Sequence, residues 1–400
     1  MTDRTGPPPG GRDYDVVLLG GTGFTGGLTA EYLAGHAGAA RWALAGRNPA
    51  KLAELRDRLA RRNPACAGLP LLPVDVGDPA ALRGLAESTR VVATTVGPYL
   101  HLGEPLVAAC AAAGTDYVDL TGEPEFVDQM FLRHQATALA TGARIVHSCG
   151  FDSIPHDLGT YFTVAQLPEG VPLRIDGYVR GNGAPSGGTF HSLLTIAARL
   201  PQSVAAARSR AHRESDVTGR AVHAGAGRPG RDRAAGGWVL PMPTIDPRVV
   251  GRSAAALPRY GPDFRYRHHA VLPSLPLAAA VVGGAAALLA VAQLPPARNW
   301  LMGRMPLGTG PSEQRRARSW FAVRFVGEGG GRRVVTEVSG GDPGYGETAK
   351  MLAESALCLA MDDLPPTRGQ VTPAAAMGEA LLKRLDAAGL SFTVLHEGPR

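Results

Sequence analysis

The chain has 400 residues, of which 44% are hydrophobic and 19% charged, and its formal net charge is +6. This composition excludes a disordered chain and is typical of a folded globular protein that is long enough for two domains. The basic residues are scattered and nearly all are arginines, so we expect no nucleic-acid-binding surface. The cysteines lie far apart without metal-ligand spacing, which favours reduced thiols, no bound metal and a cytoplasmic location; they are Cys66, Cys110, Cys149 and Cys358.

Strand and helix patterns alternate through the first 150 residues. Residues 1–12 are rich in proline, glycine and polar side chains and show no signal-peptide pattern, so we predict a disordered leader. Behind it, strands are predicted at Asp15–Leu19, Trp42–Ala45, Leu71–Val74, Val91–Thr95, Tyr117–Leu120 and Ile145–Ser148. This alternation predicts an α/β fold in which residues 13–150 form a Rossmann domain with a doubly wound parallel sheet.

A glycine-rich motif follows the first predicted strand, and it reads Gly20-Gly21-Thr22-Gly23-Phe24-Thr25-Gly26. The motif alone is weak in a chain with 52 glycines. Its position after a strand and before a helix strengthens it, because such a turn lets the backbone approach a pyrophosphate at the helix N-terminus. We therefore predict a dinucleotide site formed by these seven residues, as opposed to an ordinary glycine-rich turn.

The end of the second strand indicates which dinucleotide binds. An NAD site would place an acidic residue there for the ribose 2′-hydroxyl, whereas a 2′-phosphate needs a cation. This chain has Arg47 and no neighbouring acid, so we predict NADP(H), the alternative being a solvated arginine. Asp75, after the third strand, is predicted to meet the adenine edge, and Gly97 and Pro98, after the fourth, to contact the cofactor.

Beyond Pro155 the predicted strands are separated by longer and less regular connections. Residues 151–346 are expected to form a second α/β domain, with a mixed or antiparallel sheet, that binds the substrate. Its predicted strands are Leu173–Arg180, Trp238–Leu240, Phe264–His269, Phe321–Glu328 and Arg332–Ser339, the last two forming an antiparallel hairpin. Residues 347–400 are predicted to hold two helices, Glu347–Met361 and Pro373–Ala388, that pack back near the first domain.

Two further segments suggest contacts outside the fold. Residues 277–294 carry no charge, and the sequence leaves three alternatives open: a surface helix that touches membrane or lipid, a buried helix, or a membrane span. The arginine-rich stretch from Arg199 to Arg233 could meet an acidic carrier protein or an anionic membrane, or be a solvated loop.

Five motifs together resemble the saccharopine dehydrogenase-like oxidoreductases and, more narrowly, the trans-acting enoyl reductases of actinobacteria. The resemblance spans residues 13 to 400, and the last three motifs are far more specific than the glycine loop. The motifs are residues 20–26 (GGTGFTG), 97–99 (GPY), 117–123 (YVDLTGE), 150–159 (GFDSIPHDLG) and 340–348 (GGDPGYGET). The resemblance implies a Rossmann domain, NADPH as hydride donor, and reduction of a carbon–carbon double bond in a polyketide or lipid intermediate supplied by partner enzymes.

Reduction of an enoyl thioester needs a hydrogen-bond donor for the enolate oxygen and a proton for the α-carbon. Tyr99 is our first candidate for the donor, although it could equally pack under the cofactor. Further candidates lie on neighbouring loops, and Asp152 among them could simply cap the next helix. Tyr345 could close over the substrate as a lid. The further candidates are His101, Glu123, Cys149, Asp152 and His156.

The sequence therefore predicts an NADP-dependent oxidoreductase for a lipid-like enoyl substrate in lipid or glycolipid biosynthesis. An acyl carrier or polyketide synthase is the expected partner, and the expected location is the cytoplasm, at the inner face of the plasma membrane. Two alternatives remain open: a saccharopine dehydrogenase-like enzyme for an amino acid, and a non-catalytic NADP-binding protein associated with a membrane. The sequence does not indicate an oligomeric state.

Overall fold

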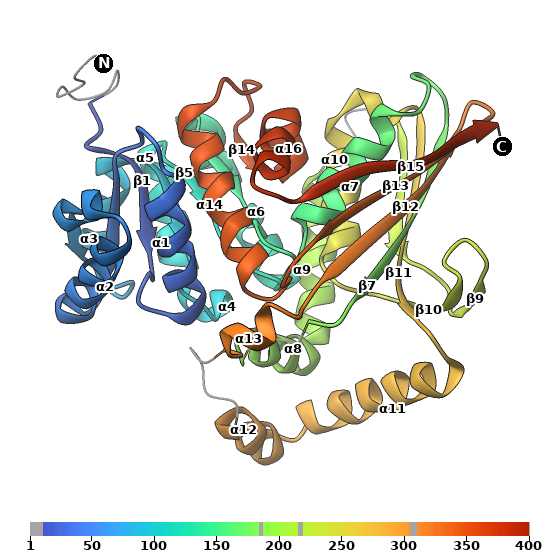
Figure 1. Ribbon diagram of the computed structural model, residues 1–400, viewed down its shortest axis with the longest axis horizontal. Helices are drawn as coiled ribbons and strands as arrows, with labels where there is room; N and C mark the ends of the chain where they lie inside the picture. The colour runs from blue at the N-terminus through green and yellow to red at the C-terminus, as the bar shows by residue number, and fades with distance from the viewer. Residues whose placement is uncertain (1–10, 184–186, 215–218, 305–309, 400) are drawn as a thin grey trace.

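The computed structural model describes residues 11–183, 187–214, 219–304 and 310–399. Two sheets stand side by side, with helices packed around and between them (Figure 1). The chain enters at the first sheet and ends at the far edge of the second (Figure 1). The predicted fold class, a parallel Rossmann sheet followed by a mixed and mostly antiparallel sheet, is confirmed.

The first sheet is parallel and has the strand order β14-β6-β5-β4-β1-β2-β3. This is the doubly wound order, in which the order of the strands reverses between β1 and β4 and leaves a crevice at the carboxyl ends of these two parallel strands. The strands are β1 (Tyr14–Leu19), β2 (Trp42–Gly46), β3 (Leu71–Pro73), β4 (Thr89–Thr94), β5 (Asp116–Val118), β6 (Arg144–Val146) and β14 (Gly369–Val371).

Helices cover both faces of this sheet. Their starts follow the sequence signals: Asn48 Oδ1 accepts the Lys51 N–H, and Asp78 Oδ1 accepts the Ala80 N–H, each before a proline in the first turn. The helices are α1 (Phe24–His36), α2 (Pro49–Arg62), α3 (Pro79–Ser88), α4 (Tyr99–Leu102), α5 (Glu104–Ala113) and α6 (Pro124–Thr141), with a 3₁₀ turn, η1 (Pro64–Gly68).

Helix α7 (Ile154–Ala165) leaves the first sheet after β6 and packs against β12 and β13 of the second. The second sheet has the order β15-β13-β12-β7-β11-β10-β9, with β8 also paired to β11. The predicted hairpin is confirmed, since β12 and β13 pair antiparallel from Phe321 with Gly340 to Gly329 with Arg332. The strands are β7 (Leu173–Gly181), β8 (Ala221–Ala226), β9 (Gly230–Asp232), β10 (Gly237–Pro241), β11 (Asp263–Leu272), β12 (Phe321–Gly329), β13 (Arg332–Gly340) and β15 (Ser391–Pro399).

The remaining helices connect these strands or join the two sheets. Helix α14 packs on α1 and on strands β1, β4 and β5, while β14 and β15, which we did not expect, extend one sheet each. The helices are α8 (Gly187–Ala198), α9 (Leu200–Arg213), α10 (Asp246–Ala256), α11 (Leu275–Ala292), α12 (Pro295–Arg304), α13 (Glu313–Arg316), α14 (Gly346–Met361), α15 (Pro373–Ala376) and α16 (Gly378–Ala387), with a second 3₁₀ turn, η2 (Pro258–Tyr260).

Two segments differ from expectation. Most of the predicted leader, residues 1–10, lies outside the described residues, but Arg12 at its end is anchored, because its guanidinium donates to the carbonyls of Thr89 and Ala113 at 2.8 and 2.6 Å. Two arginines of the arginine-rich stretch form ion pairs with residues of α6: Arg199 lies 2.6 Å from Glu125, and the buried Arg210 lies 3.4 Å from Asp128. These arginines are therefore engaged within the fold.

Candidate functional site

The glycine loop joins β1 to α1 at the crevice of the first sheet. Gly20 has a φ of +94°, which a residue with a side chain rarely adopts. A Cβ on Gly26 would lie 2.2 Å from the Gly20 carbonyl oxygen, so only glycine lets the helix approach the strand this closely. The motif thus has the close-packed geometry that a dinucleotide-binding turn requires.

The N-terminus of α1 offers free donors. Gly23 occupies the N-cap without a side-chain hydrogen bond, and the first helical bond runs from Gly27 N–H to the Gly23 carbonyl. Among the hydrogen bonds of the described residues, none uses the N–H groups of Thr22, Phe24 or Thr25. Such unpaired N–H groups at a helix N-terminus bind phosphate. The loop therefore fits the pyrophosphate of a dinucleotide.

The adenosine end of this crevice carries the predicted cation. Arg47 follows β2, is exposed, and forms no hydrogen bond or ion pair within the part of the chain that the structure describes. Asp75, also exposed, follows β3, but its Oδ1 accepts the Gly77 N–H at 2.9 Å in a local turn. Because β3 pairs with β2, Asp75 and Arg47 lie at neighbouring strand ends. The exposed position of Arg47 is compatible with a 2′-phosphate, and this role stays a prediction.

Segments of the second half of the chain cover the glycine loop. The Phe24 ring contacts the buried Tyr345 ring edge-on, with centroids 4.9 Å apart, and the Arg316 guanidinium lies 5.5 Å from the Phe24 ring centroid. A Cβ on Gly310 would lie 2.3 Å from the Phe24 ring. The loop with Tyr345, predicted to be a lid, is therefore packed against the start of α1.

Tyr99 and Glu123 hold the loops after β4 and β5 together. The buried Tyr99 hydroxyl donates to the Thr94 carbonyl at 3.1 Å and accepts the Leu120 N–H at 3.2 Å. Burial raises the pKa of Tyr99 well above its usual range. The buried Glu123 carboxylate accepts the Tyr99 and Leu100 N–H groups at 3.3 and 2.8 Å, and the Ser192 hydroxyl at 2.8 Å. Both side chains are engaged in positioning the backbone.

The other loop candidates are placed differently. Gly97 and Pro98 lie between β4 and α4, where Gly97 is exposed, and His101 is exposed on α4. Cys149 is buried, its thiol donates to the Val146 carbonyl, and burial raises its pKa well above the usual range, so it remains an unreactive thiol. Of these residues, Gly97, Pro98 and His101 follow the carboxyl end of β4, and Gly97 and His101 are exposed there.

A buried polar network that we had not predicted orders the ends of β5 and β6. The Asp119 carboxylate accepts the Tyr117 hydroxyl at 2.9 Å, the Ser148 N–H at 2.8 Å and the Thr121 N–H at 3.1 Å, and lies 2.7 Å from His147 Nδ1. Ser148 has a positive φ of 62°. This network fixes the start of the loop that carries Asp152.

Asp152 lies at the junction of the two sheets, between β6 and α7. A Cβ on Gly122, after β5, would lie 2.9 Å from Asp152 Oδ2, so the carboxyl group faces the carboxyl ends of the strands. The expected helix cap is wrong: Ser153, with a φ of 146°, occupies the N-cap of α7, and the Asp152 side chain forms no hydrogen bond with the other described residues. Asp152 is thus a half-buried carboxyl held in a strained loop.

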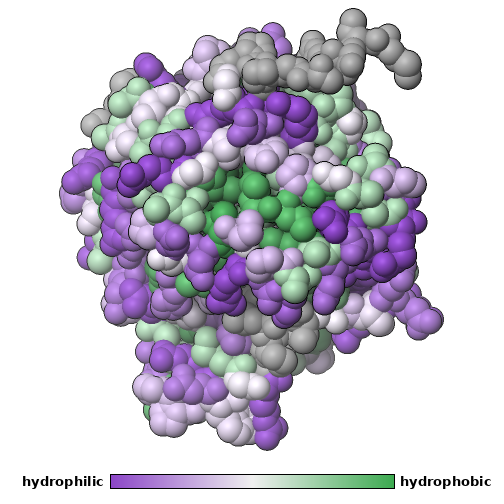
Figure 2. Space-filling view, turned by 90° about the vertical axis from the view of Figure 1, so that its left-hand side faces the viewer, coloured by the Kyte–Doolittle hydropathy of each residue, from purple (hydrophilic) through white to green (hydrophobic). Residues whose placement is uncertain are grey.

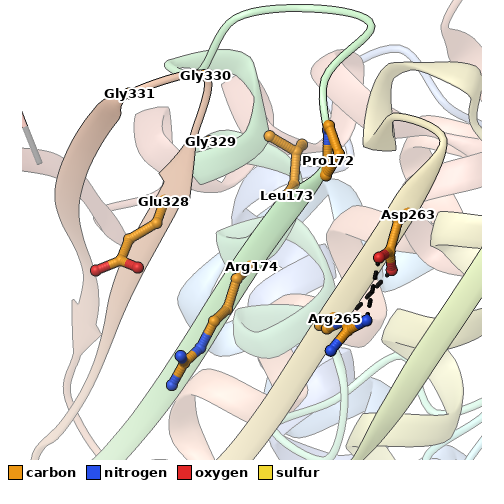
Figure 3. Close-up of a pocket in the computed structure, with 9 residues that line it drawn as sticks. All are labelled: Pro172, Leu173, Arg174, Asp263, Arg265, Glu328, Gly329, Gly330 and Gly331. Atoms are coloured by element: carbon orange, nitrogen blue, oxygen red, sulfur yellow. Dashed lines mark hydrogen bonds and ion pairs between the residues drawn. The ribbon is translucent and has the colours of Figure 1, made fainter.

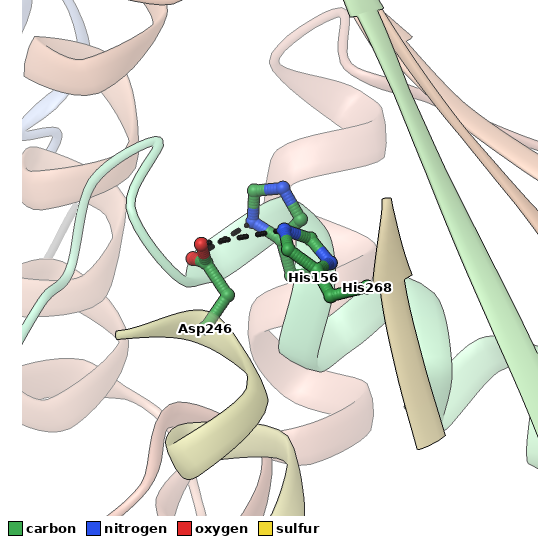
Figure 4. A group of neighbouring side chains, drawn as sticks. All are labelled: His156, Asp246 and His268. Atoms are coloured by element: carbon green, nitrogen blue, oxygen red, sulfur yellow. Dashed lines mark ion pairs between the residues drawn. The ribbon is translucent and has the colours of Figure 1, made fainter. Parts of the chain in front are cut away.

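Behind Asp152 lies a buried cluster of His156 on α7, Asp246 on α10 and His268 on β11 (Figure 4). Asp246 Oδ1 lies 3.1 Å from His156 Nδ1, and Asp246 Oδ2 lies 3.5 Å from His268 Nε2. On its other side, His268 Nδ1 lies 2.8 Å from the Tyr266 hydroxyl. The possible ligand atoms of the three residues lie within 4.8 Å of one another, and two imidazoles with one carboxylate are a ligand set that Zn²⁺ accepts. Here, however, the Asp246 carboxylate contacts both imidazole rings directly.

The electrostatics of this region drive apart the pKa values of the Asp152 and Asp246 carboxyl groups. Burial and then the charge of Asp246 raise the pKa of Asp152 to about 6, although His156 opposes them. Burial also opposes the charge of Asp246, but His156 and then His268 outweigh it and hold the Asp246 pKa well below its usual range. Burial lowers the pKa of His268. Two carboxyl groups whose pKa values are driven apart in this way suit an acid beside a fixed anion.

A surface hollow of about 310 Å³ lies far from these residues (Figure 3). Its lining includes Leu173 at the start of β7 and Gly329 at the end of β12. The opposite ends of these strands, at Gly181 and Phe321, lie toward the Tyr345 loop, since a Cβ on Gly183 would lie 2.6 Å from Pro343. The hollow therefore belongs to the remote end of the second sheet and not to the cofactor crevice.

The fold, the glycine loop and the crevice define an NADP-binding oxidoreductase of the Rossmann type. Residues 16–146 match the family of the saccharopine dehydrogenase NADP-binding domain. A Mycobacterium tuberculosis protein with the provisional name of trans-acting enoyl reductase is 40% identical over 412 residues, which cover 95% of this chain and 97% of that protein. The chain thus belongs to the saccharopine dehydrogenase-like family that includes these mycobacterial proteins.

Two further proteins support this assignment. The trans-acting enoyl reductase of Mycobacterium ulcerans is 36% identical over 425 residues, covering 96% of this chain and 99% of that protein. Apo saccharopine dehydrogenase (L-Glu forming) from Saccharomyces cerevisiae shares the fold, with a TM-score of 0.56 at 13% identity over 95% of this chain and 99% of that one. The resemblance inferred from the motifs is confirmed.

Sequence reasoning missed Asp246 and His268. Asp246 precedes a proline, as Asn48 and Asp78 do, and so carried only the signal of a helix start. His268 lies within a predicted strand. No local spacing connects them with His156, because α10 packs on α7, and the His268 ring meets the His156 ring, only in the tertiary structure.

Proposed function

We propose that this protein is an NADPH-dependent reductase that saturates the carbon–carbon double bond of an enoyl thioester. The names of its mycobacterial relatives support the reaction. The single observation that carries the proposal is Asp152, a half-buried carboxyl group with a pKa of about 6 at the carboxyl edge of the parallel sheet. A group that is still partly protonated near neutral pH can act as a general acid.

The residues that would hold the cofactor are those of the glycine loop, together with Arg47 at the adenosine end. Gly97 and Pro98 would contact its other half, since they follow β4 beside the loop. NADPH supplies a hydride to the β-carbon of the substrate when it is bound. Tyr345 and Phe24 would exclude water from the covered crevice.

Asp152 would donate the proton that completes the reduction. The enolate that results from hydride addition takes this proton at its α-carbon, and the ionised Asp152 recovers a proton from water at its exposed side. The negative charge of Asp246 favours the protonated form of Asp152 and so maintains the acid. We assign Tyr99 a positioning role in place of the donor role first considered, because its proton is engaged by the Thr94 carbonyl.

Turnover with a substrate panel tests this function. NADPH oxidation would be measured with saturated and α,β-unsaturated acyl thioesters and with amino diacids. We expect oxidation only with the unsaturated thioesters and a loss of about 10²–10⁴ in kcat for Asp152→Asn. Oxidation with an amino diacid alone would favour an amino-acid dehydrogenase, and no oxidation with any substrate would favour a non-catalytic NADP-binding protein.

The choice of NADPH over NADH depends on Arg47. Replacing this exposed arginine should weaken NADPH binding by about tenfold to a hundredfold and leave NADH binding unchanged, because only NADPH carries the 2′-phosphate. Fluorescence titration of Arg47→Ala with both cofactors measures this, and Arg61→Ala, at an exposed arginine at the end of α2, is the matched control. Equal weakening for both cofactors would contradict the assignment.

The substrate source and the location are also proposals. The relatives are named as trans-acting, which supports a substrate carried by a separate acyl carrier protein or polyketide synthase, in lipid or glycolipid biosynthesis. The four cysteines are free and buried, which suits a cytoplasmic enzyme. Pull-down of carrier proteins loaded with an enoyl chain, compared with unloaded ones, tests the partner.

A further inference from the structure

Helix α11 is an apolar helix that the fold leaves uncovered. It spans Leu275–Ala292 with a mean hydropathy of 2.2, and only 11% of it is buried. Val282 and Leu289, seven residues apart on one face, are 54% and 43% exposed. Figure 1 shows α11 below the body of the protein, where it runs from the connection after β11 to α12. This excludes the buried helix that the sequence had left open, and an exposed apolar surface of this size marks an interaction site.

Another face of the molecule, the one formed by the first domain, is largely hydrophilic around a central apolar patch (Figure 2). Helix α11 touches the body mainly through α8, where its C-terminal Ala292 packs against Leu194 and Ala197. Near its start, Ala278 is buried and α11 contacts β10 and β11, so both ends of the helix are anchored while most of its length between them is exposed.

The sheet topology excludes a membrane span. Strand β11 precedes α11, and β12 follows it after α12 and α13, yet both strands flank β7 in one sheet. A single crossing of a bilayer would place β11 and β12 on opposite sides of the membrane. The helix can therefore only lie along a surface.

The charges around α11 indicate which surface this is. The chain has no acidic residue between Asp263 and Glu313, whereas α12 carries Arg298 and Arg304. Trp300 on α12 is 56% exposed, with the Arg304 guanidinium 4.1 Å from its ring centroid. Tryptophan and arginine beside an apolar helix are typical of the headgroup level of a membrane, and arginines are attracted to anionic lipids.

We propose that α11 and α12 bind the surface of an anionic bilayer, with α11 lying at the boundary between headgroups and acyl chains. A second copy of the chain fits this surface less well, because pairing α11 and α12 with the same two helices of another copy would bring the arginines of α12 together without an acidic counterpart. This surface is independent of the reaction, although it would bring the crevice to a lipid-linked substrate.

Vesicle flotation tests the proposal with the intact chain. The wild type should float with vesicles of phosphatidylcholine and phosphatidylglycerol in equal parts, and less with phosphatidylcholine alone. The double variant Val282→Glu, Leu289→Glu should reduce the floated fraction about tenfold or more, because each charge must enter the apolar layer. Leu395→Glu, at a 46% exposed leucine on β15 remote from α11, is the matched control and should float as the wild type does.

Two further measurements separate the outcomes. Arg298→Gln with Arg304→Gln should abolish the preference for anionic vesicles, and NADPH binding of every variant should be retained, which shows that it is folded. The proposal is overturned if the wild type floats with neither vesicle or if the double variant floats unchanged. It is equally overturned if the wild type is a dimer that the double variant converts to a monomer without any flotation. None of these results bears on enoyl reduction.

Discussion

Replacing Asp152 by asparagine should stabilise the protein while it removes activity. The folded protein disfavours the ionised form of this carboxyl, chiefly through burial and then through Asp246. Asparagine keeps the shape and removes the charge, so the penalty disappears. It has no acidic proton to give to the substrate, so turnover falls. A structural aspartate would show the opposite behaviour, because its loss would lower stability.

The size of the gain follows from the pKa. Raising the pKa of Asp152 from 3.8 to about 6 corresponds to a penalty of about 3 kcal/mol for the ionised form, at ~1.36 kcal/mol per pH unit. Because the side chain is half-buried, solvent screening reduces this to about 1–2 kcal/mol. With an unfolding entropy of about 2.1 cal/mol/K per residue, the melting temperature of the chain should rise by about 1–2 °C.

The pH dependence of this gain in stability distinguishes the loss of the Asp152 charge from other causes of a higher melting temperature. The folded pKa lies above the unfolded one, so the folded state binds more protons between pH 3.8 and about 6 and the wild type loses stability as pH rises through this range. The advantage of Asp152→Asn should therefore be complete above pH 6 and vanish near pH 3.8. Calorimetry from pH 4 to 8 measures it, with Asp57→Asn, at an exposed carboxylate of α2, as the control. A melting temperature that falls at pH 7.5, or a change that is constant with pH, would refute the reasoning.

Two further predictions concern the loop and the buried cluster. Gly26→Ala should destabilise the apo protein by about 1–3 kcal/mol and abolish NADPH binding, because its Cβ would lie 2.2 Å from the Gly20 carbonyl oxygen. Gly23→Ala is the control, since its Cβ would lie 3.4 Å from the same atom, and it should change apo stability by less than about 0.5 kcal/mol. Urea unfolding compares the two variants. Asp246→Asn should lower the free energy of unfolding at pH 7 by about 2–4 kcal/mol, and this loss should shrink in acid as the wild-type carboxylate becomes protonated. Because Asp246 raises the pKa of Asp152, the variant should also move the Asp152-dependent limb of the kcat–pH profile to lower pH. A limb that does not move would contradict the coupling of the two carboxyl groups.

The cofactor half of the site could be predicted from the sequence because its signals are local. Gly20 to Gly26 occupy one continuous turn, and Arg47 follows the next strand, so strand order alone brings them to one edge. The proposed catalytic half could be predicted only in part: Asp152 is among the sequence candidates, but the roles of the others depend on contacts. Tyr99 follows β4 as expected, yet its availability depends on the Thr94 carbonyl and the Leu120 N–H, which no spacing in the sequence reveals.

The sequence by itself determined the Rossmann domain, the dinucleotide loop and the family, since periodicity and contiguous motifs act over a few residues at a time. Only the tertiary structure decided that Asp152 faces the strand ends, that His156, Asp246 and His268 meet behind it, and that α11 lies exposed on one side of the sheet. These properties arise from burial and from the contacts of α7 with α10 and β11, which follow it only much later in the chain. Burial and contacts of this kind set a pKa or expose a helix, and they exist only once the chain has folded.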